Sequence, residues 1–199
     1  MENSKINRRR FILAGTAGLI MPQPALAKAK FNFTSGLTSS SYASNYRGKT
    51  IVRYRTREKV GTIIINTSER RLYRVLSGGK AIKYGVGVGR AGFEWSGVAK
   101  IQRKAEWPAW RPPAEMIVRE RQKYGRELPA VMKGGPNNPL GARALYLYQG
   151  KRDTLYRIHG TNNPASIGKA LSSGCIRMLN EEVIDLFNQT RRGTKVIVL

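Results

Sequence analysis

The stretch His159–Met178 reads HGTNNPASIGKALSSGCIRM and holds the only histidine and the only cysteine of the protein, His159 and Cys175. A thiol becomes a strong nucleophile when a base takes its proton, and a neutral imidazole is the best base available at neutral pH. Arg177 follows Cys175 by two positions, so in an extended segment both side chains point the same way. We expect Arg177 to bind a carboxylate or to stabilise a thiolate. A structural thiol with an unrelated surface histidine remains the alternative.

The residues around this pair resemble the signature of the YkuD-type L,D-transpeptidases, a bacterial cell-wall family. That signature is H-G-T, a loop containing I-G, and then S-x-G-C-[IV]-R. It is found here as HGT at 159–161, SIG at 166–168 and SSGCIR at 172–177. Many members carry a second histidine two residues before the cysteine, where this chain has Ser173. His159 is therefore the only imidazole that can serve as the base.

The resemblance implies a mainly β fold, a YkuD-type catalytic domain of curved, mostly antiparallel sheets with short helices, over residues 60–199. It implies that Cys175 is the nucleophile and His159 the proton donor and acceptor. The Gly160 carbonyl is expected to orient His159, and the backbone at Gly174 is expected to form an oxyanion hole. A last group of residues is expected to contact the substrate: Arg177, Ser172, Ser173, Thr161, Trp110 and Arg111. Trp110 and Arg111 belong to it because Trp-Arg-Pro-Pro at 110–113 resembles a family segment near the groove.

The reaction implied by the resemblance is acyl transfer through a thioester. The thiolate attacks the third residue of a peptidoglycan tetrapeptide stem, D-Ala leaves, and the amine of a second stem forms a 3→3 cross-link. The same thioenzyme with water as acceptor is an L,D-carboxypeptidase, and envelope proteins or free D-amino acids are further acceptors that the sequence leaves open. Carbapenem β-lactams are expected to acylate the same thiol. A non-catalytic, basic wall-binding module is the alternative from a different class.

Charge and composition limit the partners. The 199 residues carry a formal charge of +24, with 41% hydrophobic residues, which suits a globular domain that binds polyanions. No helix-turn-helix, zinc-finger or RNP-like motif stands out, so we expect peptidoglycan stems rather than nucleic acid. One histidine and one cysteine do not make a typical metal site, so neither a metal nor another cofactor is expected. A single cysteine excludes an intrachain disulfide.

The N-terminal residues predict export. Residues 1–27 combine Arg8–Arg10, an apolar run and the small-x-small sequence Ala25–Ala27, as a signal peptide does. The arginines resemble the twin-arginine motif, with a Sec signal or an uncleaved anchor as alternatives. The apolar run is shorter than the ~20 residues of a membrane span, so we expect a periplasmic protein without a stable transmembrane segment after cleavage. Residues 28–59 are predicted to be a basic flexible linker.

Alternating apolar residues and turn signals predict the regular structure. A helix is expected at 114–124, after Pro113. A second helix is expected to begin with Asn180 as its N-cap and to stop at Gly193. His159 ends a strand, which fixes the direction of its side chain. Seven strands are expected, at residues 62–66, 71–76, 80–88, 97–104, 142–148, 153–159 and 195–199.

Overall fold

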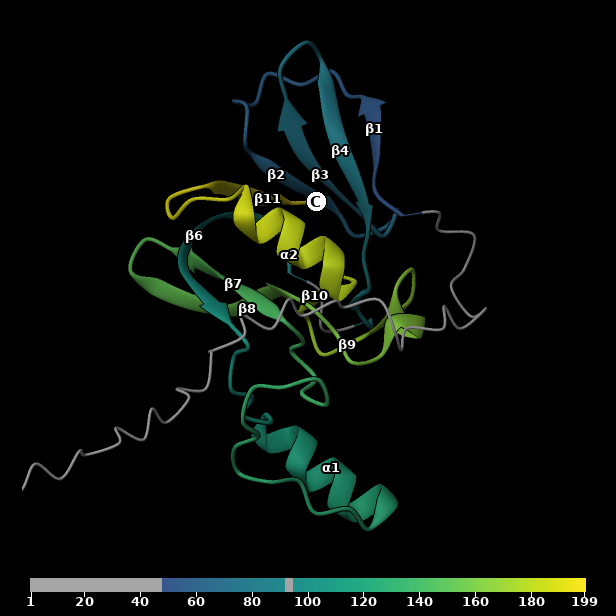
Figure 1. Ribbon diagram of the computed structural model, residues 1–199. Helices are drawn as coiled ribbons and strands as arrows, with labels where there is room; N and C mark the ends of the chain where they lie inside the picture. The colour runs from purple at the N-terminus through teal and green to yellow at the C-terminus, as the bar shows by residue number, and fades with distance from the viewer. Residues whose placement is uncertain (1–47, 92–94) are drawn as a thin grey trace, which may run out of the picture. The chain divides into compact units, whose positions relative to one another are not determined.

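The computed structural model describes residues 48–91 and 95–199, and it is mainly β (Figure 1). The strand order in its nine-stranded sheet is β1 (Thr50–Arg53), β4 (Lys80–Gly85), β3 (Arg71–Leu76), β2 (Ile63–Asn66), β11 (Lys195–Val198), β6 (Gly97–Glu106), β7 (Arg143–Gln149), β8 (Arg152–His159) and β10 (Ile176–Arg177). A separate pair consists of β5 (Val88–Gly89) and β9 (Ala170–Ser172). The remaining elements are α1 (Ala114–Tyr124), the 3₁₀ turn η1 (Pro164–Ser166) and α2 (Asn180–Asn188). The predicted mainly β fold is confirmed.

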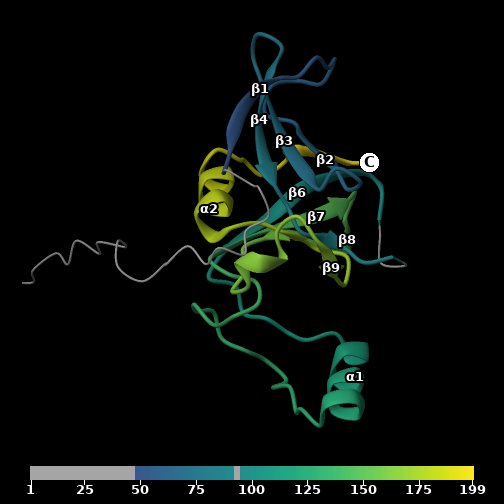
Figure 2. The ribbon, with the colours of Figure 1, turned by 90° about the vertical axis from the view of Figure 1, so that its right-hand side faces the viewer.

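One apolar cluster joins both halves of the sheet to α2. The isoleucines of β2 and the leucines of β7 are fully buried, as expected for strands covered by other elements. Helix α2 lies against the sheet in both views (Figures 1 and 2), and its spacing of apolar residues turns Val183 and Leu186 into the cluster. Burying one such side chain fully stabilises the fold by about 1.5–3 kcal/mol. The cluster therefore fixes how β7 and β8 lie, and these strands lead to the candidate site.

The predicted flexible linker is wrong for its last part. Residues Thr50–Arg53 form β1, which pairs antiparallel with β4. Tyr54 stacks on Tyr73 with ring centroids 4.5 Å apart, and Glu58 forms an ion pair with Lys195 at 2.8 Å. The basic composition hid the strand, because backbone pairing with β4 holds it while its side chains stay mostly exposed. The predicted signal peptide and the first part of the linker lie outside the described residues.

The strand predicted at 80–88 is also wrong in its extent, because β4 ends at Gly85. Gly87 instead exchanges two backbone hydrogen bonds with Arg177, of 2.8 and 2.9 Å. A Cβ atom at Gly87 would lie 2.6 Å from the carbonyl oxygen of Ser166. Glycine is therefore required where the N-terminal half of the sheet meets the loop that carries Cys175.

The segment between β6 and β7 holds α1, whose predicted bounds of 114–124 are confirmed. Gly125 ends the helix in the left-handed conformation, with φ of 60°. No residue of α1 is buried, and both views show the helix apart from the sheet (Figures 1 and 2). Within the described ranges, no helix combines the length and apolarity that crossing a bilayer demands.

Candidate active site

The candidate site is built on the parallel pair of β8 and β10. Ile176 pairs with Ile158, and Arg177 pairs with His159. Both isoleucines belong to the buried cluster. Because side chains alternate along a strand, the neighbouring residues project from the opposite side of the sheet. That side therefore carries a group of four: Arg157, His159, Cys175 and Arg177.

His159 is held as a neutral base. Its side chain is buried, and its Nδ1–H donates to the carbonyl oxygen of Gly160 at 2.5 Å. This bond leaves Nε2 as the nitrogen that can accept a proton. Burial lowers the pKa of His159 to about 4, and the positive charges of Arg177 and Arg157 also lower it. The imidazole is therefore unprotonated at neutral pH, as a general base requires.

Asn180 anchors the turn that carries the Gly160 carbonyl. Its Oδ1 accepts hydrogen bonds from the backbone N–H groups of Ala142 at 2.9 Å and Thr161 at 3.2 Å. A Cβ atom on Gly160 or Gly141 would collide with this same oxygen, so the two glycines permit the contact. The prediction that Asn180 caps α2 is wrong. The N-cap position belongs to Leu179, without a side-chain cap, because the amide of Asn180 turns to the loop instead.

The thiol of Cys175 is partly covered, and burial raises its pKa. A backbone hydrogen bond from Arg157 and the charges of Arg157 and Arg177 act in the opposite direction. Sγ also lies 4.0 Å from the Leu155 carbonyl oxygen, and the described residues show no direct hydrogen bond from the thiol to His159. Catalytic hydrogen bonds often tighten only when substrate binds, so this resting geometry is compatible with proton transfer.

Arg157 is a site residue that the sequence analysis missed. Its guanidinium makes two hydrogen bonds to the Asp153 carboxylate, of 2.7 and 2.9 Å, and lies 4.4 Å from the centre of the Tyr146 ring. The available signal was its spacing, because it precedes His159 by two residues in a predicted strand. With Arg177 it adds positive charge near the thiol, and both charges lower the pKa of Cys175.

Two of the predicted substrate-binding residues, Ser172 and Thr161, are buried, and their hydroxyl groups form hydrogen bonds within the loop. Ser172 donates its hydroxyl hydrogen to the Cys175 carbonyl at 2.6 Å. Thr161 accepts a hydrogen bond from the backbone N–H of Asn163 at 3.0 Å. This burial disagrees with a direct role in substrate contact, because both hydroxyls are used within the loop. Ser173, between Ser172 and Gly174, is exposed.

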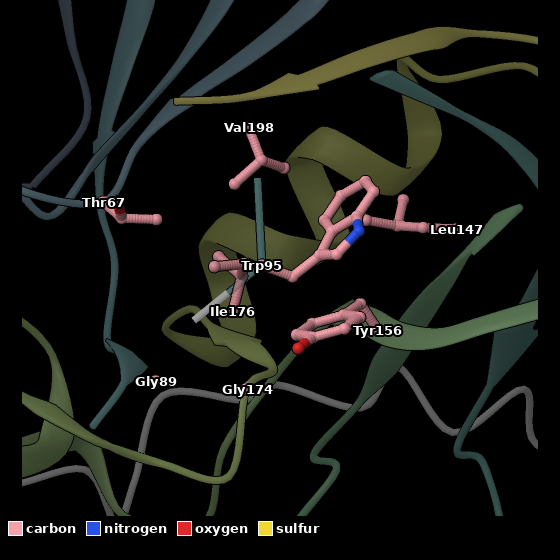
Figure 3. A pocket seen from close by; sticks show the side chains of 8 residues that line it. All are labelled: Thr67, Gly89, Trp95, Leu147, Tyr156, Gly174, Ile176 and Val198. Atoms are coloured by element: carbon pink, nitrogen blue, oxygen red, sulfur yellow. The ribbon is translucent and has the colours of Figure 1, made fainter. Parts of the chain in front are cut away.

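The backbone at Gly174 has φ of 108°, a conformation that side-chain-bearing residues rarely adopt. Gly174 and Ile176, on either side of Cys175, line a small and mostly apolar hollow (Figure 3). Trp95 and Tyr156 stack beside it with ring centroids 5.3 Å apart. Trp95 was not predicted as a site residue. It precedes β6 by only two residues, and the fold brings its ring to the hollow.

The segment 107–140 holds the other two predicted substrate residues. Trp110 exchanges backbone hydrogen bonds of 2.8 Å with Met132, and Arg111 is exposed. The contacts of the described residues do not join either side chain to Cys175 or His159. Within residues 48–91 and 95–199, no three histidine, cysteine or acidic side chains gather as a metal site would require.

Comparison with known proteins identifies the family. Residues 61–198 match the YkuD family model, described as the L,D-transpeptidase catalytic domain. The chain is 40% identical over 139 residues to a protein of Escherichia coli K12 named probable L,D-transpeptidase YbiS. That alignment covers 67% of this chain and 43% of YbiS, so the chain spans less than half the length of this curated relative.

Two solved structures are similar. One from Brucella melitensis is 47% identical, covers 79% of this chain and 98% of its own, and has a TM-score of 0.52. It is named a probable carnitine operon oxidoreductase, unlike the family model and YbiS, which agree on L,D-transpeptidase. L,D-transpeptidase 3 of Mycobacterium tuberculosis is 13% identical, with a TM-score of 0.51 and coverage of 70% and 61%, which shows a shared fold alone.

The family model spans most of the chain, and three residues of the signature quoted above, His159, Ile176 and Arg177, lie on one parallel strand pair. The chain belongs to the YkuD family of L,D-transpeptidase catalytic domains.

Proposed function

We propose that the protein is a peptidoglycan L,D-transpeptidase that works through a Cys175 thioester and forms 3→3 cross-links. The observation that carries the proposal is the β8–β10 register, in which Arg177 pairs with His159. It supports an imidazole and a thiol on the same side of the two segments, because Cys175 precedes Arg177 by two positions. Family membership supports the reaction class. The Gly160 carbonyl supports the imidazole role, because it fixes the proton on Nδ1.

The steps follow from these groups. Nε2 of His159 takes the thiol proton, and Sγ of Cys175 attacks the carbonyl carbon of the third stem residue. The backbone N–H groups around Gly174 and Cys175 stabilise the oxyanion. The carbon–nitrogen bond to D-Ala breaks, and the imidazolium returns its proton to the leaving amine. The amine of a second stem then attacks the thioester, forms the new amide and regenerates the thiol.

Arg177 and Arg157 stabilise the thiolate in this scheme. His159 is buried and neutral, so it supplies a base but no resting positive charge. A thiolate near two guanidinium groups is more stable than an isolated one, which compensates for the histidine that Ser173 replaces. Arg177 is also proposed to bind a donor carboxylate. Carbapenem acylation of Cys175 is proposed on the same chemistry.

We further propose that the protein acts in the periplasm after export through a twin-arginine signal in residues 1–27. The basic charge supports an anionic wall polymer as its surroundings. Water, envelope proteins and D-amino acids are the other proposed acceptors. Transfer to a second stem is the proposed reaction in preference to these, because the family model describes an L,D-transpeptidase catalytic domain.

The test is a reaction of the purified protein with disaccharide-tetrapeptide, followed by mass spectrometry. We expect a dimer that is lighter than two monomers by one D-Ala. Cys175→Ala should abolish it, and Asn188→Ala, at an exposed position of α2, should retain it. Tripeptide without dimer would support the carboxypeptidase. Folded wild-type protein that leaves the stem unchanged would contradict the proposed reaction.

A further inference from the structure

A row of side chains crosses the sheet from the thiol to β6. The strand register pairs Arg103 with Tyr146 and Tyr146 with Arg157. Arg157 lies one position before Ile158, as Cys175 lies one position before its partner Ile176, and the backbone N–H of Arg157 bonds to the thiol. The guanidinium carbons of Arg103 and Arg157 each lie 4.4 Å from the centre of the Tyr146 ring. We name Arg103, Tyr146 and Arg157 the cationic row.

The two arginines of the cationic row differ in exposure and in ion pairing. Arg157 is largely covered, and its guanidinium is paired with the Asp153 carboxylate through two hydrogen bonds. Arg103 is exposed, and no acidic side chain among the described residues forms an ion pair with it. A guanidinium stacked on an aromatic ring keeps its N–H groups free at the edge, where they match a carboxylate. Arg157 is therefore held in place at the end of the row beside Cys175, whereas the Arg103 guanidinium at the other end is accessible to a ligand.

The length of the cationic row suits a short peptide. From β10 to β6 there are three strand spacings of about 4.8 Å, roughly 14 Å in all. An extended peptide advances about 3.3–3.6 Å per residue. A peptide that presents a carbonyl to Cys175 therefore brings a group two or three residues upstream within reach of the long Arg103 side chain.

We propose that the cationic row is a carboxylate-binding subsite, in which Arg103 binds a free carboxylate upstream of the attacked carbonyl in an acidic peptide stem. This inference rests on the proposed function, because it assigns a recognition element to that substrate. Tyr146 and the Arg157–Asp153 pair hold the Arg103 guanidinium flat. A stem with a carboxamide at the same position keeps its shape but loses the charge, so it binds less tightly.

The test measures binding without turnover. The full chain with Cys175→Ala is titrated calorimetrically with two synthetic stems that differ only in the upstream group, a free carboxylate or a carboxamide. We expect the carboxylate stem to bind about five- to tenfold more tightly, as an exposed charge-assisted contact permits. Adding Arg103→Ala should bring the two affinities together, and Arg103→Lys should restore part of the difference.

Arg121→Ala is the matched control, because it removes an equal charge from an exposed position on α1. It should leave the preference unchanged. Equal affinities of the two stems, no measurable binding, or an equal loss with Arg121→Ala would overturn the subsite. Turnover of the stems by the unaltered protein is recorded separately. A carboxylate preference in binding without turnover would contradict the proposed reaction and leave the subsite supported. Turnover without a carboxylate preference would support the reaction and overturn the subsite.

Discussion

Asn180→Ala tests whether one side chain sets the geometry of the base. The change removes the acceptor of two backbone N–H groups, those of Ala142 and Thr161, and both of these residues are buried. A buried donor left without a partner costs about 1–3 kcal/mol. We therefore expect the free energy of unfolding to fall by roughly 2–6 kcal/mol for the two donors together. Water that enters the vacated space favours the lower end of this range.

The same change should affect catalysis beyond its effect on stability. Once the turn is released, the Gly160 carbonyl no longer holds the Nδ1–H of His159 in place. Small misplacements of a catalytic group cost up to about a hundredfold in rate. We expect kcat to fall at least about tenfold on this basis, with KM changed far less.

The assay is urea unfolding and steady-state kinetics of four proteins: the wild type, Asn180→Ala, Asn180→Asp and Asn188→Ala. Asn180→Asp keeps an oxygen acceptor and should recover most of the stability, whereas Asn188→Ala, at an exposed position of the same helix, should behave as the wild type. A loss below about 0.5 kcal/mol in Asn180→Ala, within the range of surface substitutions, would refute the reasoning. Lower stability with unchanged kcat would refute the link from Asn180 to His159.

Three further predictions concern stability. Burial lowers the pKa of His159 to about 4, whereas the histidine of the unfolded chain titrates near pH 6.5. Between these two pH values the unfolded chain therefore binds a proton that the folded protein does not bind. Stability should therefore fall as the pH drops from about 6.5 to 4, by up to roughly 3 kcal/mol more than in His159→Gln; parallel urea-unfolding curves for the two would contradict this. Tyr84→Phe removes the 2.7 Å hydrogen bond from a buried hydroxyl to Asp185 and should cost about 1–2 kcal/mol by thermal unfolding, whereas no change would mean that the bond is not stabilising. A protein that starts at residue 59 lacks β1 and should unfold at lower urea concentration and self-associate through the bared β4 edge, unlike one that starts at residue 48; equal midpoints would show that β1 adds nothing.

The sequence predicted well whatever depends on neighbouring residues. The bounds of α1 and β3 follow from the proline before the helix and from the turns around the strand, and both were predicted correctly. His159 and Cys175 were singled out because each is unique in the chain, and their roles as base and nucleophile stay predictions. By contrast, β1 was missed because its partner strand lies about thirty residues away and its own side chains are basic and exposed.

Contacts between distant residues account for the rest. Asn180 was misread as a helix cap, because its true partners lie 19 and 38 positions earlier and only the folded loop brings them near. Ser172 and Thr161 stand in the signature, yet sequence position does not reveal that the loop buries them. Arg157 was missed because its relation to Cys175 depends on strand register, which no local pattern encodes.

The parallel pairing of β8 with β10 needs a crossover connection, and this connection is itself held by the rest of the fold. Residues 160–175 form it. Within it Ser166 and Ile167 are buried, and the backbone N–H of Gly168 donates to the carbonyl oxygen of Val86 at 3.1 Å. The connection therefore acts as a second clamp on the strand pair, so a change in its length or packing would displace the proposed nucleophile relative to its base.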